Sequence, residues 1–242
     1  PLIEEGDNLV EIILTALERN KISLSNGNVL VIAQKIVSKS EGRYASLNDI
    51  KPSQQAIDLS RETDKDPKLV QLILNESKEV VRYRKGVIVV ENILGLIHAN
   101  AGIDKSNIKS DSNNPRVLLL PLNPDKSATE IRKEILKKTK KKVGIIINDS
   151  SGRAWRNGIV GIAIGSSGAE VLSDLKGNLD LFGNTLEVTE VGKADEVASA
   201  ASLLMGQGKE ALPVVVIKGL TESEDLNGAK ALIRKPSEDL FR

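Results

Sequence analysis

The chain has 242 residues, and its 34 Lys and Arg nearly balance 33 Asp and Glu, which gives a formal net charge of +1. A nearly neutral surface excludes a general attraction to nucleic acid or to a membrane. The chain contains no Cys and one His, which excludes disulfides, thiolate zinc sites, Cys nucleophiles and zinc sites built on two or three His. No segment approaches the roughly 20 apolar residues of a membrane span. No signal peptide is visible, so a cytoplasmic protein is expected. The sequence begins at Pro1 rather than Met, and a few preceding residues are expected.

Apolar periodicity predicts a mixture of helices and strands. Asp7 is the expected N-cap of the first helix, and Asp66-Pro67 is expected to cap and open the third. Ser127 to Glu130 reads as a capping box, and Asp195 as the cap of the last helix. In chain order the pattern predicts a helix at 9–17, a strand at 29–33 running on into 34–39, helices at 52–59 and 67–74, strands at 80–81, 87–90, 94–99 and 117–120, a helix at 127–138, strands at 143–147, 158–165 and 186–191, a helix at 195–205 and a strand at 214–217.

These elements show no strict alternation of strand and helix. The predicted fold class is therefore α+β, with mixed sheets and flanking helices, rather than a doubly wound parallel sheet. One domain is expected over residues 1–242, and the loop at 110–115 is the best candidate for a division into two subdomains.

Two aspartates in small polar segments are the main candidates for chemistry. Asp149 directly follows the apolar run at 143–147, which predicts a buried strand that delivers a carboxylate to a sheet edge. Asp104 follows a predicted strand and Gly102. Carboxylates with a neighbouring hydroxyl such as Ser150 are ligands for a hard divalent cation. An aspartate that stabilises a turn has the same local pattern, so each one alone allows both interpretations. If both reach one metal, the chain is predicted to be a phosphate-handling enzyme.

Several basic and aromatic residues lie near these aspartates in the sequence. Lys39, at the expected end of a strand, is either a point charge for phosphate or a solvated surface lysine. Arg153 and Arg156 carry guanidinium groups suited to carboxylates and phosphates. Trp155, the only Trp, either stacks on a planar ligand or fills the core. The single His98 is read first as a strand residue packed near the site.

Two further segments have a structural and a functional reading. The basic run at 137–142 is favoured as a helix C-terminus whose lysines complement the helix dipole, with an anion patch as the alternative. The segment at 205–210 is read as a Gly C-cap or as a nucleotide-contacting loop. Neither a P-loop nor a Rossmann glycine motif is present, so a nucleotide would be held in another way.

Taken together, the motifs resemble the coenzyme F-420:L-glutamate ligase family, the GTP-dependent gamma-glutamyl ligases of deazaflavin coenzyme biosynthesis. The resemblance runs nearly end to end. Its segments are 1–3, 37–43, 100–107, 149–165, 194–196 and 203–208.

The resemblance implies a family-specific α+β ligase fold in an intertwined homodimer. Some relatives carry a C-terminal flavin domain, which is expected to be absent from a chain that ends at Arg242. The counterparts of Asp104 and Asp149 hold a divalent cation, and those of Ser150 and Gln207 serve a second one. The positions that the resemblance assigns to GTP are Pro1, Leu2, Ile3, Gln34, Lys35, Lys39, Asn107, Ser150, Met205, Gly206, Gln207, Gly208, Lys209, Glu210, Ala211 and Leu212.

The chain departs from the family pattern at four of these positions. Gln34 and Lys35 replace a pair of small hydroxyl residues, Ser150 stands where Thr is common, and Gln207 is neutral where a relative carries Glu. The expected cofactors are GTP as a substrate, two Mg²⁺ or Mn²⁺ ions and, as a further candidate, K⁺.

The reaction implied is the activation of the carboxylate of the deazaflavin precursor as an acyl phosphate, which the amine of L-glutamate then converts into an amide. A second cycle adds a gamma-linked glutamate. Lys39 is expected to steady the phosphates, and Arg153 or Arg156 to orient an anionic substrate. The alternatives are another nucleotide- and metal-dependent amide ligase or kinase on the same scaffold, and a non-catalytic nucleotide-binding protein.

Overall fold

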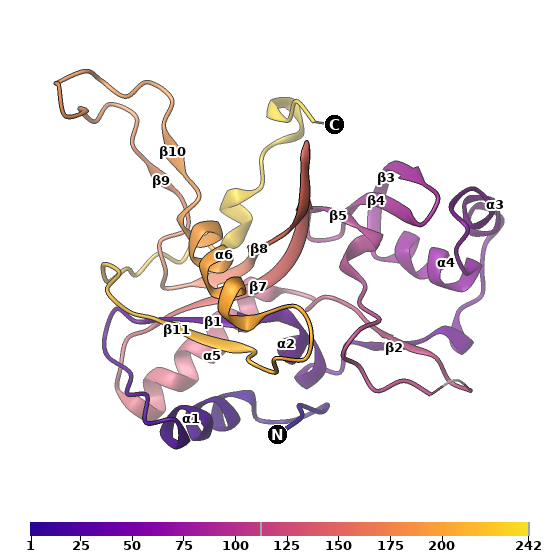
Figure 1. Cartoon of the computed structure of the whole chain (residues 1–242), viewed down its shortest axis with the longest axis horizontal. Helices are drawn as coiled ribbons and strands as arrows, with labels where there is room; N and C mark the ends of the chain where they lie inside the picture. The colour runs from indigo at the N-terminus through magenta and orange to yellow at the C-terminus, as the bar shows by residue number, and fades with distance from the viewer. Residues whose placement is uncertain (112, 242) are drawn as a thin grey trace.

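The computed structural model describes residues 1–111 and 113–241. Ser112, inside the predicted division at 110–115, and Arg242, at the predicted end of the domain, lie outside the described residues. Helices and several small sheets are mixed along the chain, in agreement with the predicted mixture of elements (Figure 1). No helix within the described part of the chain is long and apolar enough to span a membrane.

The largest sheet has four strands in the order β11-β1-β7-β8. Its members are β1 (Val29–Ala33), β7 (Gly144–Arg153), β8 (Arg156–Ser167) and β11 (Val214–Ile217). β1 and β7 are parallel, whereas β11 and β8 pair antiparallel to their neighbours. The parallel pair is buried on both faces, which explains its nearly continuous apolar sequence.

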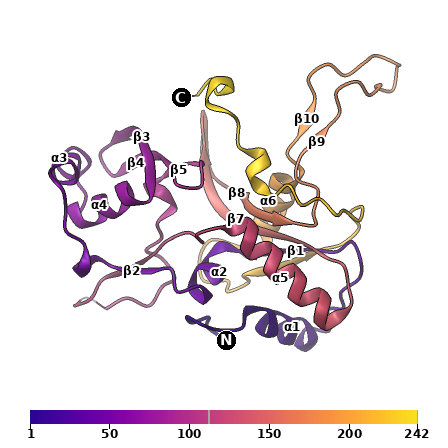
Figure 2. The same ribbon diagram turned by 180° about the vertical axis from the view of Figure 1, so that it is seen from behind.

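Alternation along these strands supplies apolar side chains to both faces of the sheet. Leu30, Ile32, Ile145 and Ile147 face the layer of α1 (Leu9–Arg19) and α5 (Pro124–Thr139). Val29, Val31 and Ile146 face α6 (Lys193–Met205), which packs through alanines. The result is a sheet between two helical layers, visible from both sides in Figures 1 and 2.

A separate group of apolar side chains lies in the segment between β2 and β6. Its core combines residues such as Leu59, Val70, Ile73 and Ile88. Both views place this segment beside the main sheet (Figures 1 and 2). Its elements are β2 (Tyr44–Ser46), α3 (Gln54–Thr63), α4 (Pro67–Asn75), β3 (Ser77–Arg84), β4 (Val87–Asn92), β5 (Ile97–Ala99) and β6 (Arg116–Leu118). The predicted division at 110–115 remains a prediction.

Two hairpins extend outward from the body of the molecule (Figure 1). One is the end of the β7–β8 pair. The other runs from β9 (Ser173–Asp174) to β10 (Glu190–Val191). The remaining short elements are α2 (Gln34–Ser40) and the 3₁₀ turns Leu47–Asp49, Asn100–Gly102, Ala229–Leu232 and Pro236–Glu238.

The structure corrects several predicted helix starts. Asn8, not Asp7, caps α1 by accepting from Glu11 N, and α3 begins after the cap Ser53 rather than at Pro52. The capping box at 127–130 was wrong, because α5 begins a turn earlier behind Asn123. Asp195 lies inside α6, whose N-cap is Gly192, and its carboxylate accepts from Ala163 N. The Asp66-Pro67 start of α4 and the lysine-rich end of α5 are confirmed.

Three predicted strands were also wrong in extent. Residues 34–39 belong to α2, so Lys39 lies in the last turn of a helix and not at a strand end. The strand predicted at 94–99 is limited to Ile97–Ala99, because Asn92 Oδ1 accepts from the backbone of Leu94 and Leu96 in a preceding turn. Within the predicted strand at 186–191, only Glu190 and Val191 pair.

Candidate active site

Asp149 lies inside a strand rather than at a strand end. β7 continues through the polar residues to Arg153, because the backbone ladder with β8 does not depend on side-chain polarity. Ile147 pairs with Gly165 and Asn148 with Ala163, so one extra residue of β8 forms a bulge immediately before Asp149. Bulges re-aim the side chains that follow them. The prediction of a carboxylate at a sheet edge was therefore wrong, although the carboxylate does leave the apolar core, with 12% of its side chain exposed.

Asp104 is presented by an unusual turn. Asn100, Ala101 and Gly102 have φ values of 51°, 58° and 73°, three successive residues in the left-handed region. Such a conformation is costly for non-glycine residues and is maintained only by surrounding structure. Asp104 then exchanges two backbone hydrogen bonds with Leu118, both of 2.9 Å. This isolated bridge fixes the main chain from which the carboxylate projects.

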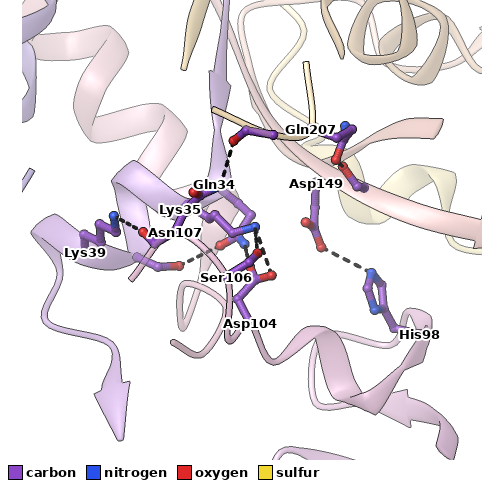
Figure 3. A network of polar contacts seen from close by, with 12 residues as sticks. Gln34, Lys35, Lys39, His98, Asp104, Ser106, Asn107, Asp149 and Gln207 are labelled. Carbon is purple, nitrogen blue, oxygen red and sulfur yellow. Dashed lines mark hydrogen bonds and ion pairs between the residues drawn. The ribbon is translucent and has the colours of Figure 1, made fainter. Parts of the chain in front are cut away.

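The structure brings the two aspartates into one site (Figure 3). Burial raises the pKa of Asp104, Lys35 opposes that change, and the negative charge of Asp149 raises the pKa further. The charge of Asp149 therefore acts on Asp104, although the two residues are 45 positions apart in the chain. Two neighbouring carboxylates favour a cation between them.

Both oxygens of Asp104 contact side chains of α2. Lys35 Nζ lies 3.0 Å from Oδ1, and Gln34 Nε2 donates to Oδ2 at 2.6 Å. Lys35 Nζ also donates to Ser106 Oγ at 3.4 Å. Gln34 is itself oriented by the buried Ser38, whose hydroxyl donates to Gln34 Oε1 at 2.9 Å. The sequence analysis assigned Gln34 and Lys35 to nucleotide, and it did not foresee their contacts with Asp104.

His98 contacts the other aspartate. Its Nε2 lies 3.2 Å from Asp149 Oδ2, close enough for an ion pair, but the two atoms are not aligned as a hydrogen bond. Burial alone would lower the pKa of His98, yet Asp149, the Ala99 carbonyl and Asp104 together raise it. The prediction that His98 is a strand residue packed near the site is confirmed. Its contact with Asp149 had no signal in the sequence.

A chain of polar contacts joins three further segments across the site (Figure 3). Lys39 Nζ donates to the carbonyl oxygen of Asn107 at 2.7 Å, and Asn107 Nδ2 donates to Gly208 O at 3.1 Å. Burial and the nearby Lys35 lower the pKa of Lys39, against the effect of Asp104. Lys39 and the segment at 206–212 therefore meet through Asn107.

The segment that follows α6 is also tied to β7. Ser150 Oγ donates to Gln207 Oε1 at 2.9 Å, and Gln207 Nε2 donates to Ser202 Oγ at 3.1 Å. Gly206 is the C-cap of α6, which confirms the structural reading of this glycine. Ser150 and Gln207, the two neutral residues assigned to a second cation, thus contact each other. Ser202 supports Gln207, and the sequence analysis did not identify it.

The oxygen atoms of the site fit a hard divalent cation. Asp149 Oδ2 is buried without a hydrogen-bond partner among the described residues. Asp104, Ser150 and Gln207 add oxygen atoms of the kind that Mg²⁺ and Mn²⁺ accept. Among residues 1–111 and 113–241, no group of three or more His, Cys, Asp or Glu is arranged for a metal. A cation here would therefore be held by two carboxylates, neutral oxygens and a ligand such as phosphate.

Other predicted site residues lie outside this network. The side chain of Met205 is buried in the core beneath α6, where Asn148 Nδ2 contacts its Sδ at 3.6 Å. Ile3 is buried, Leu2 is exposed, and the N-terminal segment reaches the end of α2 through a bond from Gly6 N to Ser40 O of 3.0 Å. Beyond Gly208, the exposed positions are Lys209, Glu210, Ala211 and Leu212.

Arg153 and Arg156 face each other at the end of the β7–β8 hairpin, and both are exposed. Arg153 is four residues beyond Asp149, about 13 Å along an extended strand. Trp155, between them, is 89% exposed, which excludes its alternative reading as a core residue. The two arginines are thus not brought into the cluster of Asp104 and Asp149.

Comparisons with known proteins agree on one family. The model of the F420-0:Gamma-glutamyl ligase family matches residues 1–219. A protein of Methanocaldococcus jannaschii named Coenzyme F420:L-glutamate ligase is 45% identical over 100% of this chain and 94% of its own length. Proteins with the same name from Methanothermobacter thermautotrophicus and Methanopyrus kandleri are each 43% identical, over 100% and 99% of this chain and 95% and 93% of their own lengths. The chain therefore belongs to the F420-0:gamma-glutamyl ligase family.

Proposed function

We propose that this protein is a GTP- and divalent-metal-dependent ligase that joins L-glutamate to the coenzyme F420 precursor and then adds a further gamma-linked glutamate. The observation that carries the proposal is the convergence of Asp104 and Asp149 with Lys39 and the segment at 206–212, within a chain of this family. Paired carboxylates beside lysines suit a reaction in which a phosphoryl group is transferred.

In the proposed reaction, a carboxylate oxygen of the precursor attacks the γ-phosphorus of GTP. The bond from that phosphorus to the bridging oxygen breaks, and GDP leaves. The amine of glutamate then attacks the carbonyl carbon of the acyl phosphate, inorganic phosphate leaves, and the amine loses a proton. When bound, two Mg²⁺ or Mn²⁺ ions would neutralise charge on the transferred phosphoryl oxygens.

Different residues of the chain would bind the metal ions and the nucleotide phosphates. Asp104 and Asp149 would hold one cation, and Ser150 with Gln207 would contribute neutral oxygens to the second. Lys39 is fixed by Asn107 at one side of the site, where its ammonium would contact nucleotide phosphate. Burial and the nearby Lys35 lower the pKa of Lys39, and a phosphate oxygen beside it would favour its charged form. K⁺ is a further proposed cofactor, tested by replacing K⁺ with Na⁺ in the assay.

A direct assay tests the activity. Purified protein is incubated with the deazaflavin precursor, L-glutamate, Mn²⁺ and either GTP or ATP, and the products are analysed by mass spectrometry. We expect GTP-dependent mass increases of one and then two glutamyl residues, with one phosphate released per addition. Equal rates with ATP would contradict the guanine preference. A precursor that is phosphorylated but never gains glutamate would indicate a kinase. Binding of the nucleotide without any turnover would indicate a non-catalytic binding protein.

We also propose that two copies form an intertwined homodimer with the family-specific fold. The support is the apolar surface on the outward hairpins. Leu181 and Phe182, at the end of the β9–β10 hairpin, are 98% and 90% exposed, and Trp155 ends the other hairpin. Leu179 and Val188 on the same hairpin are also exposed, and a group of exposed apolar side chains of this kind favours an interaction surface. A partner would place Arg153 and Arg156 against a second protomer, where they are proposed to orient the anionic substrate.

Phe182→Asp is expected to convert the dimer into a monomer, because a carboxylate would have to be buried in an apolar interface. Light scattering after size-exclusion chromatography measures the mass of the particle. Lys176→Asp, on the same hairpin but polar in the wild type, serves as the control and is expected to stay dimeric. A wild-type protein with the mass of one chain at micromolar concentration would contradict the dimer.

A further inference from the structure

The ammonium group of Lys35 occupies the position beside Asp104 at which a metal cation would bind. Its ammonium is 3.0 Å from Asp104 Oδ1, and Gln34 occupies the other oxygen of the same carboxylate (Figure 3). The two side chains are only partly exposed, 30% for Lys35 and 23% for Asp104. An ion pair at this depth is screened less by salt than a surface pair.

The backbone conformation fixes the positions of both Lys35 and Asp104. Gln34 and Lys35 form the first turn of α2, directly after β1, and Ser38 one turn later orients Gln34. Asp104 is fixed by its backbone bridge to Leu118. Ser106 Oγ gives the ammonium of Lys35 a further contact at 3.4 Å. Lys35 is thus directed at Asp104 by rigid elements and not by a flexible loop.

The charges explain why a cation is needed there. Asp104 lies close enough to Asp149 for the two negative charges to repel each other. A lysine supplies one positive charge to this pair. A divalent ion on Asp104 would stand beside the ammonium of Lys35, with Lys39 nearby on the same helix face. Like charges at such distances repel strongly, so Lys35 and a divalent ion cannot both keep full contact with Asp104.

We propose that Lys35 is a built-in counterion that holds Asp104 in the metal-free protein and competes with the divalent cation for it. This inference rests on the proposed role of Asp104 as a metal ligand. When a nucleotide is present, its phosphates give Lys35 a new anionic partner. Nucleotide and metal therefore bind cooperatively, because the nucleotide removes the competitor of the metal.

The test compares Mn²⁺ binding to wild type, Lys35→Met and Lys35→Arg without nucleotide. Free Mn²⁺ is followed by electron paramagnetic resonance. An opposite charge within about 4–6 Å changes the proton affinity of a carboxylate by roughly 10- to 1000-fold, so Lys35→Met is expected to bind Mn²⁺ at least about tenfold more tightly. Lys35→Arg keeps the charge and is expected to bind as weakly as wild type.

Two further variants separate the causes. Lys133→Met, on the exposed face of α5, removes one positive charge elsewhere and is expected to leave Mn²⁺ affinity within about twofold of wild type, since exposed distant charges are screened. Asp104→Asn is expected to abolish the gain when combined with Lys35→Met. The double variant therefore shows whether the tighter binding depends on Asp104.

A second titration measures the cooperativity. Mn²⁺ affinity is determined with and without guanosine 5′-(β,γ-imido)triphosphate. We expect the nucleotide to increase the affinity more in wild type than in Lys35→Met, by about the tenfold that the substitution itself provides, because the two effects are linked.

Equal or weaker Mn²⁺ binding by Lys35→Met than by wild type, with binding lost in Asp104→Asn, would overturn the competition and leave the metal role of Asp104 intact. Mn²⁺ binding that is unaffected by Asp104→Asn would instead remove Asp104 from the metal site, and the inference would fall with it. The two failures are thus distinguishable in one set of titrations.

Discussion

Asp149→Asn is expected to lower the rate of glutamate addition by about a thousandfold or more, with the fold unchanged. A bound metal supplies several kcal/mol of transition-state stabilisation, and each 1.4 kcal/mol corresponds to about tenfold in rate. The amide removes the negative charge that would hold the cation. It keeps the shape of the side chain, so β7 and its ladder with β8 should form as before.

The stability of this variant separates a catalytic role from a structural one. Asp149 Oδ2 is buried without a hydrogen-bond partner among the described residues, and its charge repels Asp104. Loss of that charge removes both the repulsion of Asp104 and the attraction to His98. Because these two effects oppose each other, the free energy of unfolding in metal-free buffer is expected to stay close to that of wild type. Phosphate release at saturating GTP, Mn²⁺ and glutamate gives the rate, and urea unfolding gives the stability.

Asp58→Asn is a matched control, because it makes the same chemical change on the exposed face of α3. We expect this variant to keep the wild-type rate. A rate for Asp149→Asn within tenfold of wild type would contradict the proposed metal role of Asp149. A large drop in stability together with the rate would instead assign the residue to the fold.

The sequence predicted the two aspartates but not how they are supported. The pattern of β1 and β7 identified the central strands because short continuous runs of β-branched apolar residues are typical of strands buried on both faces. His98 reaches Asp149 only through the packing of β5 beside β7, 51 residues further along the chain. No local pattern records a contact of that kind.

The error at residues 34–39 has a clear physical origin and a consequence for the site. Ile36 and Val37 favour a strand locally, yet both are buried inside α2, where packing determines the conformation. In a strand, Lys35 and Lys39 would lie on one side with Val37. In the helix they are one turn apart, so Lys35 reaches Asp104 while Lys39 reaches Asn107.

The close approach of α6 to β8 depends on Gly161, which pairs with Ser150 across the ladder. A Cβ at this position would lie 2.5 Å from the carbonyl oxygen of Ala198 and 2.8 Å from Ser202 Cβ. Ser199 Oγ also donates to the carbonyl oxygen of Gly161 at 2.7 Å. The helix thus packs directly onto the backbone of the strand, and it carries Ser202, which supports Gln207.

Gly161→Ala is expected to lower the free energy of unfolding by about 2–3 kcal/mol, because the added methyl group overpacks a contact formed by backbone. α6 must move outward, which separates Gln207 from Ser150 and should also lower glutamate addition. Gly152→Ala is the control on the neighbouring strand, since a Cβ there meets nothing within 4 Å. Urea unfolding and the glutamate-dependent rate are measured for both variants. Equal free energies of unfolding for Gly161→Ala and Gly152→Ala would contradict the tight packing of α6. If Gly161→Ala is destabilised but keeps the wild-type rate, the contact of Gln207 with Ser150 is not needed for the reaction.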